Sequence, residues 1–242
     1  QYLDFAALGN VVAGQSTLEL RATVSSGLAA SFEVVSGPAT VAGSTLTFNG
    51  IGKVVVKARQ VGDETFNPAL AVTRSVTTVL QEQVITFPAI AARTYGDGPL
   101  PLSVLNARAD SGLAVEYAVL RGPGVFGPNG LILSGAGEVV VRVSQLGNAT
   151  IAAARPVDQN IVVAPRELRV TAVAASRVFG AANPPFGVAY EGFVNGDTFA
   201  KLEAAPVVVT SATEAAGPGT YALTPTGGRS ANYRFSFVNA LL

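Results

Sequence analysis

The feature that most constrains the fold of this 242-residue chain is an internal repeat. Residues 26–69 match residues 111–154 without a gap, at an offset of 85 positions. This period exceeds the roughly 20 to 50 residues of solenoid units, and it fits a small domain that closes its own core. The sequence therefore predicts a tandem array of domains.

Turn glycines and alternating apolar residues make up most of the matching positions. Gly37 falls on Gly122, and Gly62 falls on Gly147. Residues 53–59 alternate strictly, which predicts a half-buried antiparallel strand. Its two predicted faces are a solvated face of Lys53, Val55, Lys57 and Arg59 and a core face of Val54, Val56 and Ala58.

Strand patterns separated by turns recur along the whole chain, about seven strands to each unit, and predict an all-β fold. We expect three tandem Ig-like antiparallel β-sandwich domains in an extended rod. They are the first repeat (residues 1–80), the second repeat (81–164) and the C-terminal segment (165–242), joined by very short linkers. Residues 198–204 are the best candidate for a helical turn, with Asp197 as its N-cap.

The charge balance excludes several kinds of partner. Lys and Arg total 16, as do Asp and Glu, so there is no basic field for nucleic acid. No apolar stretch approaches the roughly 20 residues that span a bilayer, so no membrane insertion is expected.

Catalysis is not expected either. The chain has no Cys, His, Trp or Met, which removes thiolate and imidazole chemistry. Residues 122–127 have the glycine spacing of a dinucleotide fingerprint but lead into another strand instead of a helix, so no cofactor site is assigned to them. We predict a protein that is not an enzyme, with no catalytic or cofactor-binding residues.

Calcium is the one cofactor that the composition leaves open. Six acidic residues could supply oxygen ligands, but they are scattered singly, whereas calcium needs six to eight converging oxygens. We therefore expect turn roles for them and assign no metal site. They are Asp63, Glu64, Asp97, Asp110, Asp158 and Asp197.

Four spaced motifs in the C-terminal segment carry a family resemblance. Residues 178–186 contain an FG-x-x-N-P opening, residues 190–197 read YEGFVNGD, and G-T-Y and N-Y pairs follow. This order resembles the MBG family of bacterial surface-protein repeats. The motif residues are Phe179, Gly180, Asn183, Pro184, Tyr190, Gly192, Phe193, Asn195, Gly196, Asp197, Tyr221, Asn232 and Tyr233.

The second repeat resembles the related bacterial Ig-like repeats, through residues 85–88, the Tyr-Gly-Asp turn at 94–97 and the loop at 147–150. The first repeat is similar from Leu18 onward, but has Val-Ala-Gly-Gln at residues 12–15 in place of that turn.

The resemblance implies an Ig-like β-sandwich in a large secreted or outer-surface bacterial protein, often an adhesin, and implies no particular ligand. For the motif residues we expect structural roles: turn geometry at Asn183, Pro184 and residues 195–197, and core or corner packing for the aromatic residues. The aromatic residues are Phe179, Tyr190, Phe193, Tyr221 and Tyr233.

Three functions are compatible with this organisation. The first is a structural stalk that holds another module away from a bacterial surface, with the neighbouring domains of a longer chain as partners and the export signal outside this segment. The second is an adhesive module for a host or environmental glycan or mucin. The third is a fibre subunit that self-associates end to end or by strand exchange, because residues 1–5 and 235–242 both read as strands.

Overall fold

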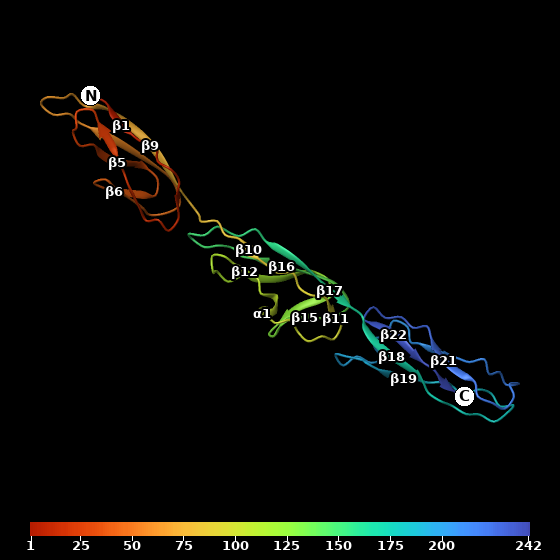
Figure 1. Cartoon of the computed structure of the whole chain (residues 1–242). Helices are drawn as coiled ribbons and strands as arrows, with labels where there is room; N and C mark the ends of the chain where they lie inside the picture. The colour runs from red at the N-terminus through yellow and green to blue at the C-terminus, as the bar shows by residue number, and fades with distance from the viewer. The chain divides into compact units, whose positions relative to one another are not determined.

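The computed structural model describes all 242 residues, and nearly all of its regular structure is β (Figure 1). Twenty-three strands are accompanied by one short α-helix, α1 (Leu102–Leu105), and one 3-10 helix, η1 (Phe199–Lys201). The prediction of an all-β fold is confirmed. None of the helices has the length and apolar character needed to cross a bilayer.

The chain divides into two compact units. Unit 1 comprises Gln1–Val84, Ala109–Ala114 and Gln145–Arg155. Unit 2 comprises Ile85–Arg108, Val115–Ser144 and Pro156–Leu242. The three-domain division at residues 80 and 164 stays a prediction.

Unit 1 contains all strands of the first repeat. They form a four-stranded sheet in the order β2-β9-β8-β5, a three-stranded sheet β3-β7-β6, and the pair β1-β4. The strands are β1 (Leu3–Phe5), β2 (Val11–Val12), β3 (Thr17–Glu19), β4 (Ala22–Val24), β5 (Ser31–Ser36), β6 (Ala39–Ala42), β7 (Thr45–Phe48), β8 (Gly52–Gln60) and β9 (Ala69–Val79).

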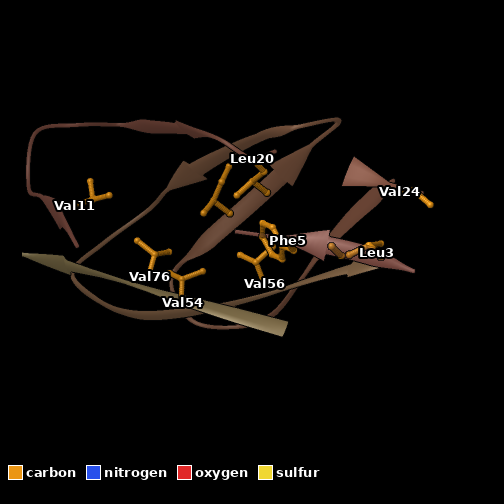
Figure 2. Packing of buried hydrophobic residues seen from close by; sticks show 10 residues of the cluster. Leu3, Phe5, Val11, Leu20, Val24, Val54, Val56 and Val76 are labelled. Atoms are coloured by element: carbon orange, nitrogen blue, oxygen red, sulfur yellow. The ribbon is translucent and has the colours of Figure 1, made fainter. Parts of the chain in front are cut away.

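The core of the first repeat lies between these sheets. Figure 2 shows its side chains, with Phe5 among them, directed into the space between the strands. Val54, Val56 and Ala58 of β8 are fully buried, whereas Lys53 and Arg59 are exposed. The predicted core face of β8 is thus confirmed, and the two layers packed around one apolar core make this part a β-sandwich.

Two equivalent networks of glutamine side chains lie in unit 1. Gln1 Nε2 donates to Gln60 Oε1 at 2.5 Å and to the carbonyl of Asn67 at 2.6 Å. Gln83 Nε2 donates to Gln145 Oε1 at 2.5 Å and to the carbonyl of Ala152 at 2.7 Å. Each network also takes in a serine hydroxyl, from Ser26 or Ser111. The repeat therefore includes a buried polar network as well as its turns and core, because buried amides need such partners.

Unit 2 contains two further sets of strands. The strands from the second repeat form a four-stranded sheet β11-β17-β16-β13 and the hairpin β14-β15. Their bounds are β10 (Ile85–Thr86), β11 (Arg93–Thr94), β12 (Arg108–Ala109), β13 (Glu116–Arg121), β14 (Gly124–Gly127), β15 (Gly130–Leu133), β16 (Gly137–Ser144) and β17 (Val157–Ala164). Leu131, Val139, Val141 and Ile161 are fully buried.

The C-terminal segment contributes two three-stranded sheets to unit 2. Their orders are β19-β18-β22 and β20-β21-β23, and β18 lies between its two neighbours in the teal and blue part of Figure 1. Leu168 and Val170 of the first sheet and Leu223 of the second are fully buried. The bounds are β18 (Arg166–Ala172), β19 (Val188–Glu191), β20 (Val207–Val209), β21 (Ala222–Thr226), β22 (Tyr233–Val238) and β23 (Ala240–Leu241).

One pairing in each set of strands departs from the purely antiparallel prediction. β2 pairs in parallel with β9, β11 with β17, and β18 with β22. In each case an early strand lies beside the last long strand of its set.

The two repeats also share a bulge where a glycine crosses a neighbouring strand. The register shifts between Val34 and Ser36 in one and between Val119 and Arg121 in the other. Gly37 and Gly122 follow with φ of 102° and 93°, and a Cβ on either would overlap the backbone of the adjacent strand. Only glycine fits such a position, which explains its repetition.

Candidate functional site

The most elaborate set of side-chain contacts in unit 2 surrounds the turn at residues 94–97, here called the Tyr95 turn. It follows β11 and lies beside the end of β17, where Tyr95 N donates to Ala164 O at 2.9 Å. Asp97 N donates to Thr94 O at 2.9 Å, and the Asp97 carboxylate accepts from Thr94 N at the same distance. Asp97 thus closes the turn. Tyr95, the residue inside this surface turn, is nevertheless buried, with only 4% of it exposed.

Tyr95 is buried because its ring packs against aromatic residues of the C-terminal segment. The ring centroids of Tyr95 and Tyr233 are 5.6 Å apart with planes at 85°. Tyr233 contacts Phe193 in the same edge-to-face manner at 5.2 Å, and Phe193 contacts Tyr190 at 5.4 Å. Each such pair contributes about 0.5–1.5 kcal/mol beyond the apolar area that it buries.

The Asp197 carboxylate joins the two tyrosines. Its Oδ2 atom accepts hydrogen bonds from Tyr95 OH at 2.9 Å and from Tyr233 OH at 2.8 Å. The Tyr233 oxygen also accepts from Val194 N at 3.1 Å. Burial raises the pKa of Tyr233 to about 12, with Asp197 adding to the rise and the Val194 amide opposing it. The phenol therefore stays protonated and donates to the carboxylate over the whole ordinary pH range.

This role replaces the predicted one for Asp197. Thr198, not Asp197, occupies the N-cap position of η1, and no side chain caps that turn. The predicted helical stretch is confined to Phe199–Lys201. The prediction of Asp197 as a helix cap was therefore wrong, because two phenols take up its carboxylate instead.

Gly96 lets the C-terminal segment approach the Tyr95 turn closely. Its φ of +88° is in the left-handed region, and a Cβ there would overlap the Val194 side chain. Arg166, at the start of β18, reaches back to donate from Nη1 to the Tyr95 carbonyl at 3.3 Å. The C-terminal segment thus contacts both the side chain and the backbone of the Tyr95 turn.

Asn232 makes a second contact with the strands of the second repeat. Its Oδ1 atom accepts from Ala136 N at 2.8 Å, beside Gly135, and its carbonyl accepts from Arg166 N at 2.9 Å. Gly135 and Ala136 form the turn that leads into β16. The C-terminal segment therefore contacts two turns, one before β16 and one after β11.

The motif residues of the resemblance fall into two groups. Tyr190, Phe193, Asp197 and Tyr233 gather at the Tyr95 turn, and Asn232 contacts the turn before β16. The loop that carries Asp197 needs positive φ at three further motif positions. These are Gly192 (φ 115°), Asn195 (φ 56°) and Gly196 (φ 77°).

The second group does not reach this junction. Asn183 Nδ2 donates to Ala212 O at 2.8 Å, and Pro184 beside it is half-buried. Tyr221 OH donates to Gly217 O at 2.9 Å. Gly180 has φ of +78° in an open turn, and Phe179 is 67% exposed. The prediction of core packing was wrong for Phe179, because its turn leaves the ring at the surface.

A turn equivalent to the Tyr95 turn exists in the first repeat, within unit 1. Ala13 N donates to Val79 O at 2.7 Å, and Gln15 N donates to Val12 O at 3.2 Å, as Tyr95 and Asp97 do in unit 2. This turn borders a hollow of about 310 Å³ that Ala149 and Thr150 also line. The backbone is the same although the Tyr-Gly-Asp sequence is missing.

The six acids considered as calcium ligands have separate partners or none. The Asp63 carboxylate accepts from the amides of Thr65 and Phe66 at 2.8 Å each, and Asp110 accepts from Val84 N at 2.9 Å. Asp158 pairs with Arg142, which lowers its pKa, mainly through their hydrogen bond. No group of three or more acidic residues lies close enough together to hold a metal ion. The prediction of no metal site, with calcium as the one cofactor left open, stays a prediction.

The structure thus defines an all-β protein in which the C-terminal segment packs on two turns of the second repeat. Residues 168–242 match the family described as MBG domain (YGX type), which confirms the resemblance predicted for the C-terminal segment. No curated protein matches the chain.

Several solved structures are similar to the chain at low identity. Drosophila N-cadherin EC1-4 is 11% identical, over 96% of this chain and 72% of that chain, with a TM-score of 0.28. Human CDH23 EC21-23 is 10% identical over 100% and 99%, with a TM-score of 0.34. Surface layer protein SbsC, domains 1-6, is 14% identical over 98% and 40%, with a TM-score of 0.27. No function follows for this chain from likeness at such scores.

Proposed function

We propose that this chain is a non-enzymatic structural spacer of a large bacterial secreted or cell-surface protein of the adhesin kind. The observation that carries the proposal is the junction at Tyr95. The C-terminal segment is held against the strands before it in three ways. Two phenols bond to one carboxylate, aromatic rings pack in a row, and a glycine allows close contact. Such a contact restricts movement between successive domains, which a spacer requires and a flexible linker does not provide.

The contacts of the acidic residues also support a structural role. The acidic side chains that make contacts close turns, pair with arginines or join the tyrosines, as Asp97, Asp158 and Asp197 do. Such contacts stabilise the fold, whereas a catalytic pair of carboxylates would converge on one substrate position.

The fibre alternative is less well supported in its strand-exchange form. β1 pairs with β4 along Leu3–Phe5, and β23 pairs with β21 at Ala240 and Leu241. Both end strands therefore already have partners in their own sheets. Exchange would first require these pairs to separate.

The glycan alternative also lacks a clear platform. Sugar-binding surfaces commonly present exposed rings in groups, because ring faces stack on sugar faces. Tyr2, Phe66, Phe179 and Phe199 are exposed by 40% to 71%, and none of them pairs with another ring. The fifth exposed ring, Phe237, is 41% exposed and stacks only on the half-buried Phe235. The spacer is therefore the function that the geometry supports best.

The test is solution scattering on the full chain, as wild type, as Tyr95→Ala and as the matched control Tyr2→Ala. Tyr2 is 71% exposed, so Tyr2→Ala removes a tyrosine that takes no part in a junction. We expect one fixed arrangement of domains to fit the wild type and Tyr2→Ala, and only a broad ensemble to fit Tyr95→Ala. The wild-type profile should not change with protein concentration or with added calcium.

Two results would overturn the proposal. A wild type that already needs a broad ensemble would remove the restricted junction on which the spacer rests. Tight retention of the wild-type chain on a mucin-type glycan column, lost when one exposed ring is removed, would identify an adhesive module instead.

A further inference from the structure

The Tyr95 turn has a second counterpart at residues 178–181, here called the Phe179 turn. Ala181 N donates to Val178 O at 3.2 Å, as Asp97 N does to Thr94 O. The glycines that follow the aromatic residues have φ of +78° at Gly180 and +88° at Gly96. The segment that leads into the Phe179 turn lies beside a last strand, since Ala175 N donates to Leu241 O at 3.1 Å, and Phe179 and Leu242 line one hollow.

A second turn lies next to each of these two turns. In the second repeat, Gly135 and Ala136 precede β16, which pairs with β17 from Gly137 opposite Val163. In the C-terminal segment, residues 217–221 precede β21, which pairs with β23 from Ala222 opposite Leu241. The topology therefore puts an equivalent pair of turns at the end of each set of strands.

In the second repeat this pair of turns contacts Asn232 and Tyr233. Asn232 bonds to Ala136 N in one turn, and Tyr233 packs on Tyr95 in the other. In the C-terminal segment the equivalent turns enclose an open hollow of about 220 Å³. It is lined by Arg177, Phe179, Pro218, Tyr221 and their neighbours, and by the last residue, Leu242.

The two surfaces differ in what covers them. The Tyr95 ring is 4% exposed and the Phe179 ring 67%. A Cβ on Gly96 would overlap Val194, whereas one on Gly180 would have no neighbour within 4 Å. The exposed residues Val178 and Phe179 and the hollow beside them thus present an uncovered apolar surface in the backbone geometry that is covered at the Tyr95 turn.

We propose that the Phe179 turn and its hollow bind the leading end of a further domain of the same kind as the C-terminal segment. This rests on the proposed spacer function and names the contact that would extend it. The further domain would place its equivalent of Tyr233 on Phe179 and its equivalent of Asn232 against residues 217–221.

The charge of the hollow suits this occupant. Phe179 has no hydroxyl, so it cannot donate to the incoming equivalent of Asp197 as Tyr95 does. Arg177 lines the hollow and donates from Nη1 to Ala181 O at 2.8 Å, which holds its guanidinium at the turn. The positive charge beside the hollow attracts the incoming carboxylate in place of the missing phenol.

The test extends the full chain after Leu242 by a second copy of residues 165–242 and removes the Phe179 ring from the first copy. Phe179→Ala is made in the extended and in the unextended chain, and both are followed by calorimetry. We expect less than about 1 °C of change in the unextended chain. In the extended chain we expect the unfolding midpoint of the added copy to fall by at least about 4 °C.

Phe199→Ala in the first copy is the matched control. Phe199 is 66% exposed, almost the same as Phe179, but lies on η1 and lines none of the hollow. It should leave both chains unchanged. Hydrogen exchange supplies an independent measurement, since the amides of residues 178–181 and 217–221 should exchange at least tenfold more slowly in the extended chain than in the unextended one.

Equal midpoints for the extended chain with and without Phe179→Ala, together with unchanged exchange at both turns, would overturn the inference. The original Tyr95 junction stays inside the extended chain, so loss of the spacer function would appear there and not at Phe179. Self-association of the unextended chain that depends on Phe179 would assign the surface to a second copy of this chain, and would overturn the proposed occupant.

Discussion

The Tyr95 turn and the Phe179 turn have nearly the same backbone but opposite burial. Each closes with one backbone hydrogen bond, 2.9 Å long in one and 3.2 Å in the other, and each continues into a glycine at positive φ. The Tyr95 ring is nevertheless 4% exposed and the Phe179 ring 67%. The local sequence thus determines the turn, whereas the adjoining segment determines whether its ring becomes part of a core.

The turn around Ala13 extends this comparison. It has the same backbone bonds but no aromatic ring, and Ala149 and Thr150 line the hollow beside it. A ring is therefore not needed to form the turn. It is needed for the aromatic row and the carboxylate bridge that Tyr95 makes.

The largest expected effect comes from removing the two rings in turn. Tyr95→Ala deletes a buried ring and leaves Asp197 with one phenol, so we expect the free energy of unfolding to fall by about 3–4 kcal/mol. Phe179→Ala in the same 242-residue chain should change it by less than about 0.5 kcal/mol, because that ring is already exposed. Chemical denaturation of both variants measures the difference.

Equal effects of these two substitutions would break the comparison. A small effect for both would mean that the Tyr95 contact adds nothing to stability in solution. A large effect for both would mean that Phe179 is covered in solution, as in self-association, and dilution of the sample would then reduce it.

The second prediction concerns the glycines that follow the two rings. Gly96→Ala adds backbone strain at φ +88° and an overlap with Val194, and should cost about 3 kcal/mol. Gly180→Ala has φ +78° and free space around its Cβ, so only the strain of about 1 kcal/mol remains. Thermal unfolding measures both losses of stability, and their difference is the cost of the overlap with Val194 without the backbone strain. Equal losses would show that Val194 moves aside easily.

Much of the fold follows from the sequence, for local reasons. Alternation at residues 53–59 predicts the buried face of β8, and the 85-residue offset matches Gly37 to Gly122, each of which follows a bulge in the structure. These features depend on neighbouring residues and on close backbone contacts. The helix α1 lies outside this reach, because its four residues show no periodicity.

The junction could be predicted only in part. The resemblance marks Asp197, Asn232 and Tyr233 as motif residues, and all three contact the second repeat. Their partners Tyr95 and Ala136 lie 102 and 96 residues away along the chain. The periodicity of apolar residues along the sequence does not predict contacts between residues so far apart. The nearest signal is that two tyrosines and one aspartate occur in short turn motifs, which is compatible with ordinary turns as well.

The third prediction uses the titration of Tyr233. Its pKa rises from the usual 10 to about 12 on folding. Below pH 10 the phenol is protonated in both states, so this stabilising contribution is fully present. Between pH 10 and about 12 the unfolded chain loses the proton that the folded chain keeps, and about 2 kcal/mol of stability is lost. Denaturation at several pH values should show this fall in the wild type.

The Tyr233→Phe variant is the control for that titration. It keeps the ring on Tyr95 but has no phenol, so the part of the pH dependence that belongs to residue 233 should vanish. The remaining slope includes the contribution of Tyr190, whose pKa burial also raises. Identical slopes for wild type and variant would show that Tyr233 is not buried against Asp197 in solution.

The smallest expected effect concerns Asn232, which tests whether the second turn matters independently of the first. Asn232→Ala removes the acceptor of Ala136 N and should cost about 1 kcal/mol, since a half-buried amide loses one hydrogen bond. Asn232→Asp keeps an acceptor oxygen and should recover most of that stability. Combined with Tyr95→Ala, the loss from Asn232→Ala should shrink if both turns belong to one junction, because a loosened junction no longer holds Asn232 against Ala136. Strict additivity in this double-mutant cycle would instead divide the junction into two independent contacts.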